Sequence, residues 1–442
     1  MTVTSNNKKL ALLACLWCAA AFPAHAQSIE QLLEQAIESS GEVAKARAGR
    51  NIADAELSIS ESAWLPQVNA RLYNGVANTQ QSNPLLNENT TRDTIQNNSI
   101  SLQQSIYNRP AWLQIEQSRL AQSEAHSREL EATQNLIQKW VEKLMECKQS
   151  ELVTTLAGQK LRSTALLHEQ TQYGMGRGET SPLELSAAFS ELELRQAELD
   201  EAQETLERHL WELSQLSGQP VSSLWLKKLE FKAPESTVVQ NELEQAILSN
   251  NLNLKIQNTY IQNAELNIEK TQGEHHPTVM LVAQNTQSKS ETVSTLGNQV
   301  KQNVLAIQVD IPLFSGFGTQ AQVEKAAAAL TQQRAELDSV QTDVLKEAFA
   351  AQKQLMISSN FARAYAKAIS AAEQQEKAIE TGIGHQLNSI IDLANIQAKQ
   401  TELKLKKLER ELKANQAYFS LLELTGELGV ERVVDQITQG PN

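Results

Sequence analysis

The feature of this chain that most limits its fold is an internal duplication. Three short motifs occur twice, roughly 210 residues apart: Leu-Glu-Gln-Ala-Ile at 33–37 and 243–247, a proline-led segment at 66–68 and 277–279, and a glycine-containing turn at 173–176 and 381–384. Each copy also holds short alternating segments between very long segments of helical character. A duplication of this length predicts two matching structural repeats.

The N-terminus has the features of an export signal. Two lysines precede an apolar run over residues 10–22, and the Ala24-His25-Ala26 motif offers small residues where signal peptidase cuts. The sequence therefore predicts a signal peptide over residues 1–26 and a mature chain that begins at Gln27. Cys15 ends a motif that loosely resembles a lipoprotein cleavage box, but the apolar stretch before it is short, so lipidation is the less favoured alternative.

Composition narrows the possible partners. The formal net charge of -13 disfavours nucleic acid and anionic lipid as ligands. After the signal, no segment approaches the roughly 18 apolar residues that a membrane helix needs. Any crossing of a bilayer must therefore use strands. Cys147 is the single cysteine of the predicted mature chain, so an internal disulfide is excluded.

The longest segments predict helices that exceed the size of a globular domain. Residues 319–381 contain 63 residues without glycine or proline, enough for a helix of roughly 95 Å. The matching segment, 111–173, is interrupted only by Gly158. Each long segment ends at a glycine-rich turn that a second helical pattern follows. We therefore predict two helical hairpins, at 111–217 and 319–425.

Apolar residues recur every seven positions in both long segments, which is typical of helices packed side by side: Leu130, Ile137 and Leu144 in the first, and Leu337, Val344 and Ala351 in the second. Trp140 and Trp211 are also expected to pack between helices.

Four segments alternate between apolar and polar residues, the pattern of half-buried strands. Polar residues occupy one face of the last segment, and the other face, which we predict to contact lipid, carries Leu305, Ile307, Val309, Ile311 and Leu313. The segments predict two β-hairpins, over residues 66–107 and 277–314. Their strands are expected to span roughly 10–13 residues, with polar loops at 79–96 and 286–302.

Four strands cannot close a cylinder by themselves. An open sheet edge in lipid leaves backbone groups unsatisfied, at several kcal/mol each. Several chains must therefore contribute to one barrel. The helical segments are polar over much of their surface and belong in water, so one end of the molecule is expected in a membrane and the other about 100 Å away in an aqueous compartment.

Four features appear in an order that resembles the TolC-like outer-membrane factor family: Ser101–Tyr107 leading into Trp112, the pairs Leu65-Pro66 and His276-Pro277, the segment Ile311–Gly316 and the segment Ser389–Leu393. The resemblance extends over residues 28–428. It implies a mainly α fold with transmembrane β structure: a homotrimeric 12-stranded outer-membrane β-barrel, continued by a 12-helix periplasmic α-barrel, with two tandem repeats per chain.

The resemblance also divides the chain. The repeats are expected at 27–218 and 241–428, and the segment 219–240 forms an equatorial zone together with the C-terminal region. Residues 429–442 are expected to form a tail.

The resemblance implies a passive exit channel of a tripartite export system in a Gram-negative bacterium. Its partners would be a periplasmic adaptor (membrane fusion) protein, an inner-membrane ABC or proton-driven transporter, and outer-membrane lipid. Type I secretion and multidrug efflux both stay open. The alternatives are a structural or adhesive trimeric coiled-coil protein anchored by a β-barrel, which needs no duplication, and the adaptor itself, which has one helical hairpin rather than two.

In this family, the helix after the second turn carries acidic residues into the lumen. Residue by residue, Asp392 takes the first acidic position, Glu184 is its counterpart in the first copy, and Asn395 stands where a second acid is common. Three copies would turn Asp392 into a ring of carboxylates that attracts cations and has a raised proton affinity. The alternative is that Asp392 only caps its helix.

The closed entrance of the family is held by a tyrosine and an arginine, whose positions fall here on Ile383 and Asn388, while Gln386 replaces a glycine. That latch is therefore not reproduced. Three turn residues are candidate substitutes, or else ordinary solvated residues: Arg177, Glu184 and His385. The glycines of the turns are candidate contacts for the adaptor, or else only end the helices: Gly174, Gly176, Gly178, Gly382 and Gly384.

No catalytic, cofactor-binding or metal-binding site is expected. His275 and His276 are adjacent on an extended segment and would point to opposite sides. The remaining histidines of interest are expected on helix surfaces: His126, His168 and His209. The sequence has no zinc-protease motif, nucleophile elbow or phosphate-binding loop, so an enzyme is not expected.

Overall fold

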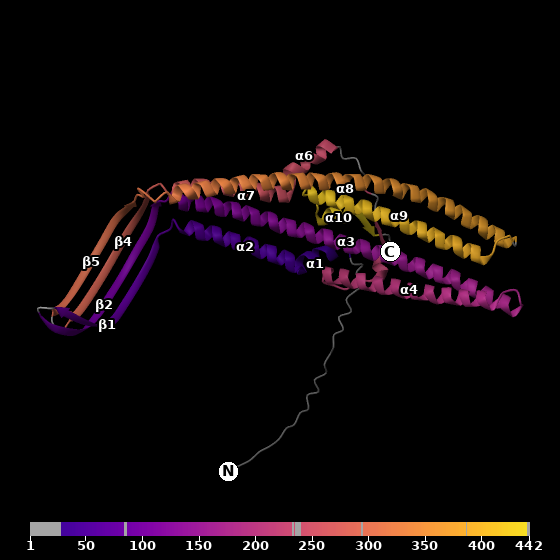
Figure 1. The fold of residues 1–442 in the computed structure, drawn as a ribbon, viewed down its shortest axis with the longest axis horizontal. Helices are drawn as coiled ribbons and strands as arrows, with labels where there is room; N and C mark the ends of the chain where they lie inside the picture. Colours follow the sequence, from indigo (N-terminus) through magenta and orange to yellow (C-terminus); the bar gives the residue numbers. More distant parts are fainter. Residues whose placement is uncertain are drawn as a thin grey trace, which may run out of the picture.

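A computed structural model describes residues 28–83, 86–231, 234, 240–292, 295–385 and 387–439. The predicted signal peptide over residues 1–26 and the turn residue Gln386 lie outside the described residues. The molecule is elongated. Long helices run side by side over most of its length, and a four-stranded sheet extends from one end (Figure 1).

The two copies fold into the same series of elements. The first contains α1 (Ile29–Ser39), α2 (Gly41–Ser62), β1 (Gln67–Asn83), β2 (Leu86–Tyr107), α3 (Arg109–Gly176) and α4 (Pro182–Ser217). The second contains α6 (Gln240–Asn250), α7 (Leu252–Gly273), β4 (Thr278–Thr292), β5 (Thr295–Asp310), α8 (Gly318–Gly384) and α9 (Ile390–Leu424). Short elements follow each copy: α5 (Ser223–Lys227) and β3 (Leu229–Phe231), then α10 (Val430–Gln436) and β6 (Ile437–Gln439). The two predicted repeats are confirmed.

Local signals set where the helices begin. Asn108 accepts the backbone N–H of Ala111 at 3.1 Å and so caps α3. Pro182 lies in the first turn of α4, where its missing N–H leaves no hydrogen bond unmade. Without interior prolines, α3 and α8 then run for 68 and 67 residues. None of the helices in the described ranges has an apolar stretch long enough to cross a membrane.

The central rod of the protomer is α3. It packs against α2, α4, α7 and α9, whereas α8 packs against α7 and α9. The residues at the predicted seven-residue spacing are buried only in part. Ile137, Leu144 and Val344 are at most 7 % exposed, but Leu130 is 44 % exposed. The seven-residue spacing therefore predicts burial at Ile137 and Leu144 but not at Leu130.

The sheet has four antiparallel strands in the order β1-β2-β4-β5, so the two hairpins meet through β2 and β4. Gln67 pairs with Gln103 in the first hairpin, and Thr278 pairs with Asp310 in the second. Strands β1 and β5 lie at the edges, and each has one side without a partner in the sheet. The sheet of one protomer is therefore open.

The strands are longer than the sequence analysis predicted. The segments 79–96 and 286–302, expected as loops, are mostly parts of the ladders, with Asn78 opposite Arg92 and Gln287 opposite Lys301. Strand β2 reaches 22 residues. The expectation was wrong because ladder hydrogen bonds join backbone groups, so a hairpin continues with Asn, Gln, Ser and Thr side chains once its register is set.

Part of the predicted lipid-facing row lies outside a strand. Strand β5 ends at Asp310, so Ile311 and Leu313 belong to the segment that leads into α8. Pro312 between them has no N–H and cannot continue a ladder. The other three members alternate along β5 and are more than half exposed in the protomer: Leu305, Ile307 and Val309.

The largest core lies where the long helices meet the short elements. It combines residues of α1, α3, α4, α5, α9 and α10, with Trp140 and Phe419 as its largest fully buried side chains. Strand β3 pairs with β6 and so joins the segment between the repeats to the C-terminal region. Val433 and Ile437 are 0 % and 2 % exposed. Much of the expected tail over residues 429–442 is therefore part of the core.

Candidate functional site

The two helical hairpins end in turns of the same geometry, at the pole opposite the sheet (Figure 1). In each turn, one glycine carbonyl accepts the backbone N–H groups of the residues three and five positions ahead. For Gly174 the two distances are 3.1 and 2.9 Å, and for Gly382 they are 3.1 and 2.8 Å. Gly384 is the last residue of α8. The duplication has preserved this pair of hydrogen bonds in both turns.

The glycines proposed for adaptor contact differ in their surroundings. A Cβ on Gly382 would collide with Oδ1 of Asn388, and a Cβ on Gly174 would lie 3.2 Å from a hydroxyl oxygen. Gly178 has a φ of +74°, which residues with a side chain rarely adopt. A Cβ on Gly176 would meet nothing within 4 Å. Turn geometry thus accounts for the first three glycines, whereas Gly176 lies at an open surface.

The predicted lumenal acids close capping boxes. Ser389 donates its backbone N–H and its hydroxyl to Oδ2 of Asp392 at 2.8 and 2.9 Å. Ser181 donates in the same way to Oε2 of Glu184 at 2.7 and 3.1 Å. The backbone bond first, and the hydroxyl bond second, lower the pKa of each carboxyl, because both bonds stabilise the ionised form. Within the protomer, the contacts of both acids are those of helix caps.

Asn395 lies one turn further along α9 and contacts the first repeat. Its Oδ1 accepts a hydrogen bond from Oγ of Ser163 on α3 at 2.9 Å. The bond connects the two hairpins of one chain on the side toward the turns. Asn395 therefore contributes to packing between the repeats.

The candidate latch residues make contacts near their own turns. Arg177 donates from Nη2 to Oη of Tyr173 at 2.6 Å, and its guanidinium lies 4.3 Å from the centroid of the same ring. Asn388 packs against the second glycine turn, His385 is exposed, and Ile383 is partly buried. The sequence analysis missed Tyr173, although its four-residue spacing from Arg177 indicates a contact on one helical face.

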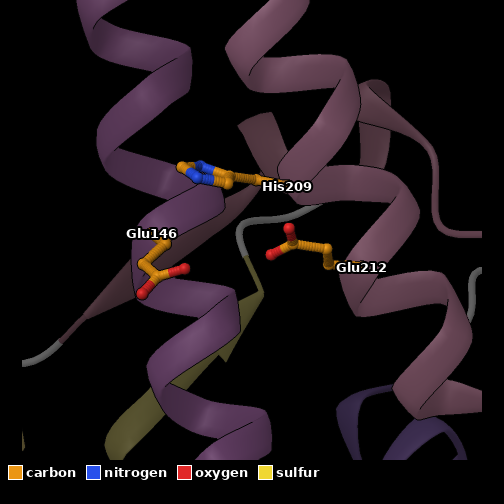
Figure 2. Close-up of side chains that lie close together, drawn as sticks. All are labelled: Glu146, His209 and Glu212. Carbon is orange, nitrogen blue, oxygen red and sulfur yellow. The ribbon is translucent and has the colours of Figure 1, made fainter.

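His209, which was expected on a helix surface, is partly buried and lies beside two carboxylates. Ligand atoms of Glu146 on α3 and of His209 and Glu212 on α4 lie within 4.8 Å of one another (Figure 2). Lys143 lies 2.7 Å from Oε2 of Glu146 and 3.0 Å from Oε2 of Glu212. These ion pairs raise the pKa of Lys143 and lower that of Glu212. A metal ion would have to displace this ammonium, so the cluster is an ion-pair network that holds α3 to α4.

Each repeat contains a β-hairpin and a long helical hairpin. The β-hairpins form an open sheet at one pole, and the glycine turns lie at the other. This architecture defines the protomer of an outer-membrane export channel. The chain belongs to the outer membrane efflux protein family, whose model matches residues 32–219 and 243–427. The two matched ranges correspond to the two structural repeats. The protein is accordingly an outer-membrane protein whose helical part lies in the periplasm.

Similar known proteins are a protein of protease secretion and proteins of the outer membrane. The chain is 24 % identical over 427 residues to the proteases secretion protein PrtF of Dickeya chrysanthemi, covering 91 % of this chain and 90 % of that protein. It is 21 % identical over 372 residues to the outer membrane protein TolC of Vibrio cholerae, covering 83 % of each. The CmeC outer membrane channel of Campylobacter jejuni has a similar fold, with a TM-score of 0.73 at 12 % identity over 92 % of this chain and 88 % of that chain.

Proposed function

We propose that this chain is one subunit of a trimeric outer-membrane exit channel, which passively conducts substrates delivered by an inner-membrane transporter and a periplasmic adaptor. The observation that carries the proposal is the open four-stranded sheet at the end of two long helical hairpins. A conduit needs a closed wall, and one chain supplies only part of it. A surface adhesin or an adaptor would not need two hairpins per chain.

A homotrimer closes both parts of the wall. The free sides of β1 and β5 carry backbone donors and acceptors that a neighbouring copy satisfies. Three copies supply twelve strands, an even number within the range of outer-membrane barrels. The helical hairpins of the same three copies then surround a continuous tunnel.

Exposed apolar side chains mark the helical surfaces that we propose neighbouring copies cover. Six of them lie on α4 and α8, and each is at least 46 % exposed: Phe189, Leu194 and Trp211 on α4, and Phe349, Met356 and Phe361 on α8. Trp211 was expected to pack between helices, but it is 63 % exposed, because it lies on the side of α4 away from the rest of the protomer. Covering these side chains removes apolar surface from water, which favours assembly.

Similarity to a protease secretion protein favours type I secretion, with an ABC transporter as the partner. Multidrug efflux with a proton-driven transporter is the alternative. Deleting the gene and measuring both secreted protein and drug susceptibility separates them. Loss of a secreted protein with unchanged drug susceptibility is the expected result, and the reverse pattern would contradict the secretion branch.

We further propose that Asp392 lines the periplasmic constriction as a ring of three carboxylates that favours cations. Its carboxyl is exposed at the turn, and the two hydrogen bonds from Ser389 stabilise its ionised form. Glu184 holds the matching position in the first repeat. Asn395 lies one turn further along α9, where the family commonly has a second acidic residue. We therefore propose that Asn395 also faces the lumen.

The variant Asp392→Asn tests the ring, because it removes the charge but keeps an acceptor oxygen for Ser389. Planar-bilayer recordings are expected to show weaker cation selectivity and weaker block by multivalent cations. Ser389→Ala is the matched control, since it removes the hydroxyl bond and keeps the charge. Unchanged selectivity in Asp392→Asn would overturn the ring.

We also propose that the surface around Gly176 contacts the adaptor. Because a Cβ there meets nothing within 4 Å, Gly176→Leu changes the surface without crowding the turn. Crosslinking to the adaptor and export are expected to fall while trimer yield stays constant. Gly49→Leu is the matched control, because Gly49 is equally open but lies on α2. Intact crosslinking in Gly176→Leu would exclude this contact.

For the closed entrance, we propose that the Tyr173–Arg177 pair of the first turn contacts a neighbouring hairpin. Tyr173 is 65 % exposed, so the pair presents its polar groups outward. Arg177→Ala is expected to raise the single-channel conductance of the closed state. His385→Ala, in the second turn, is the control, and equal conductance of both variants and the parent would exclude the pair as a latch.

A further inference from the structure

The duplication indicates how β5 of one copy meets β1 of the next. We propose that Asp310 on β5 lies directly opposite Arg71 on β1 of the neighbouring copy, and that this ion pair selects the register in which the copies close the barrel. The inference rests on the proposed function, since it concerns the seam between subunits of the proposed trimer.

Equivalent positions follow from the two hairpins. Gln67 and Thr278 are equivalent, because each follows the proline that opens the hairpin of its own repeat. Gln67 pairs with Gln103, and Thr278 pairs with Asp310. Asp310 therefore has the position on β5 that Gln103 has on β2.

The seam between the two hairpins of one chain is the template. Gln103 on β2 pairs with Val282 on β4. Val282 lies four residues after Thr278, and the residue four positions after Gln67 is Arg71. When the same seam is repeated between copies, β5 takes the place of β2, and β1 of the next copy takes the place of β4. Asp310 then lies opposite Arg71 of the next copy.

The same register matches the two faces of the strands. Directly opposite residues lie on the same face of a sheet, and the register places exposed apolar residues opposite each other: Val309 with Leu72, and Leu305 with Val76. Asp310 and Arg71 lie on the other face, because side chains alternate along a strand. A slip of one residue would place the apolar row of one strand opposite the polar row of the other.

Charge distinguishes this register from its nearest alternatives. A shift of two residues keeps the faces matched, but it places Asp310 opposite Asn69 or Tyr73, neither of which is positively charged. Within the protomer, Oδ2 of Asp310 accepts a hydrogen bond from Nε2 of Gln308 at 2.9 Å. A carboxylate has further lone pairs for a guanidinium. Of the three face-matched registers, one brings opposite charges together.

Cysteine pairs test the register. In Arg71→Cys/Asp310→Cys, oxidation is expected to join copies into covalent dimers and trimers on denaturing gels. Pairing Asp310→Cys with Asn69→Cys or Tyr73→Cys places the thiols on diagonal neighbours about 7–8 Å apart, beyond the Cα separation of about 4.4–6.8 Å that disulfides prefer. These control pairs are expected to crosslink much less. Native Cys147 is 0 % exposed, and single-cysteine variants control for it.

The outcomes separate the register from the channel itself. Stronger crosslinking by a shifted pair, in a protein that is a trimer in detergent, would overturn the register and leave the channel proposal standing. A monomer in detergent with no crosslink in any variant would overturn both.

Exchange of the two charges gives an independent readout. Arg71→Glu places two carboxylates opposite each other, so the temperature at which the detergent-resistant trimer dissociates is expected to fall. Arg71→Glu/Asp310→Arg restores opposite charges and is expected to recover the parent temperature. A double variant no more stable than Arg71→Glu would contradict the ion pair.

Discussion

Trp140 on α3 donates its indole N–H to Oγ of Ser217 at the end of α4 across 2.8 Å, and both residues are 0 % exposed. The bond joins the two helices of the first repeat inside the main core. A buried donor that loses its acceptor costs about 1–3 kcal/mol. Ser217→Ala is therefore expected to lower the free energy of unfolding by about that amount, as measured by urea unfolding followed by helical circular dichroism.

A double-mutant cycle shows whether the bond causes the effect. Trp140→Phe removes the donor and leaves most of the ring volume in place. When both partners are changed, neither group is left without its partner, so the loss is expected to be smaller than the sum of the single losses. Strict additivity would contradict the coupling.

The C-terminal strand is predicted to stabilise the whole protomer. Ile437 is 2 % exposed and pairs with Phe231 of β3. Ile437→Ala leaves a cavity in the core and is expected to cost about 2–5 kcal/mol. Glu431→Ala, at an exposed position of α10, is the control and is expected to change stability by no more than about 0.5 kcal/mol. Equal effects of the two variants would exclude a role for the tail in the core.

Glu423 on α9 is predicted to make stability depend on pH. Burial raises its pKa from 4.5 to about 7, with smaller contributions from the negative charges of Glu347, Glu142 and Glu131. The folded state then binds the proton more tightly than the unfolded state. The stabilisation of the folded state by this tighter proton binding to Glu423 is fully present below about pH 4.5. It is lost as the pH rises toward about 7, and the free energy of unfolding falls by at most about 3 kcal/mol.

The variant Glu423→Gln isolates this group, because the amide stays neutral at every pH. The variant is expected to be more stable than the parent at pH 8, and the difference is expected to shrink toward pH 5. Unfolding free energies measured across that range provide the comparison. A difference that does not vary with pH would contradict the assignment.

Two glycines are predicted to respond in opposite directions to the same substitution. Gly426, just after α9, has a φ of +71°, and a Cβ there would lie 2.8 Å from the carbonyl oxygen of Asn250. Gly426→Ala is expected to destabilise by about 1–3 kcal/mol. Gly49 lies within α2 with open space around it, so Gly49→Ala is expected to stabilise by about 0.5–1 kcal/mol. If Gly426→Ala did not change the stability in thermal unfolding, the predicted backbone strain at this position would be contradicted.

Local signals in the sequence predicted the order of elements well. Long segments without proline and with at most one glycine became the main parts of α3 and α8, and proline and glycine marked the junctions. The alternative role given to Asp392, capping its helix, is also observed, since Ser389 and Asp392 form a capping box. These features depend only on neighbours in the chain.

The predictions that were wrong, or that the sequence did not allow, concern residues whose partners are distant in the sequence. The position of His209 beside Glu146 depends on packing between α3 and α4. The contact between the segment after the first repeat and the C-terminal region was expected from the family resemblance, but no local pattern indicated that it is a pairing of β3 with β6. The polar ends of the strands were expected as loops, because the alternation of apolar and polar residues that indicates a strand is absent there. The exposed Trp211 belongs to a surface that we propose another copy covers, so one chain alone does not explain it.

The central claim is that three copies complete one channel that no single chain closes. Native mass spectrometry of the mature protein in detergent tests this claim most directly. The predicted result is one species with three times the mass of the protomer. A monodisperse monomer that stays in solution without detergent would contradict it.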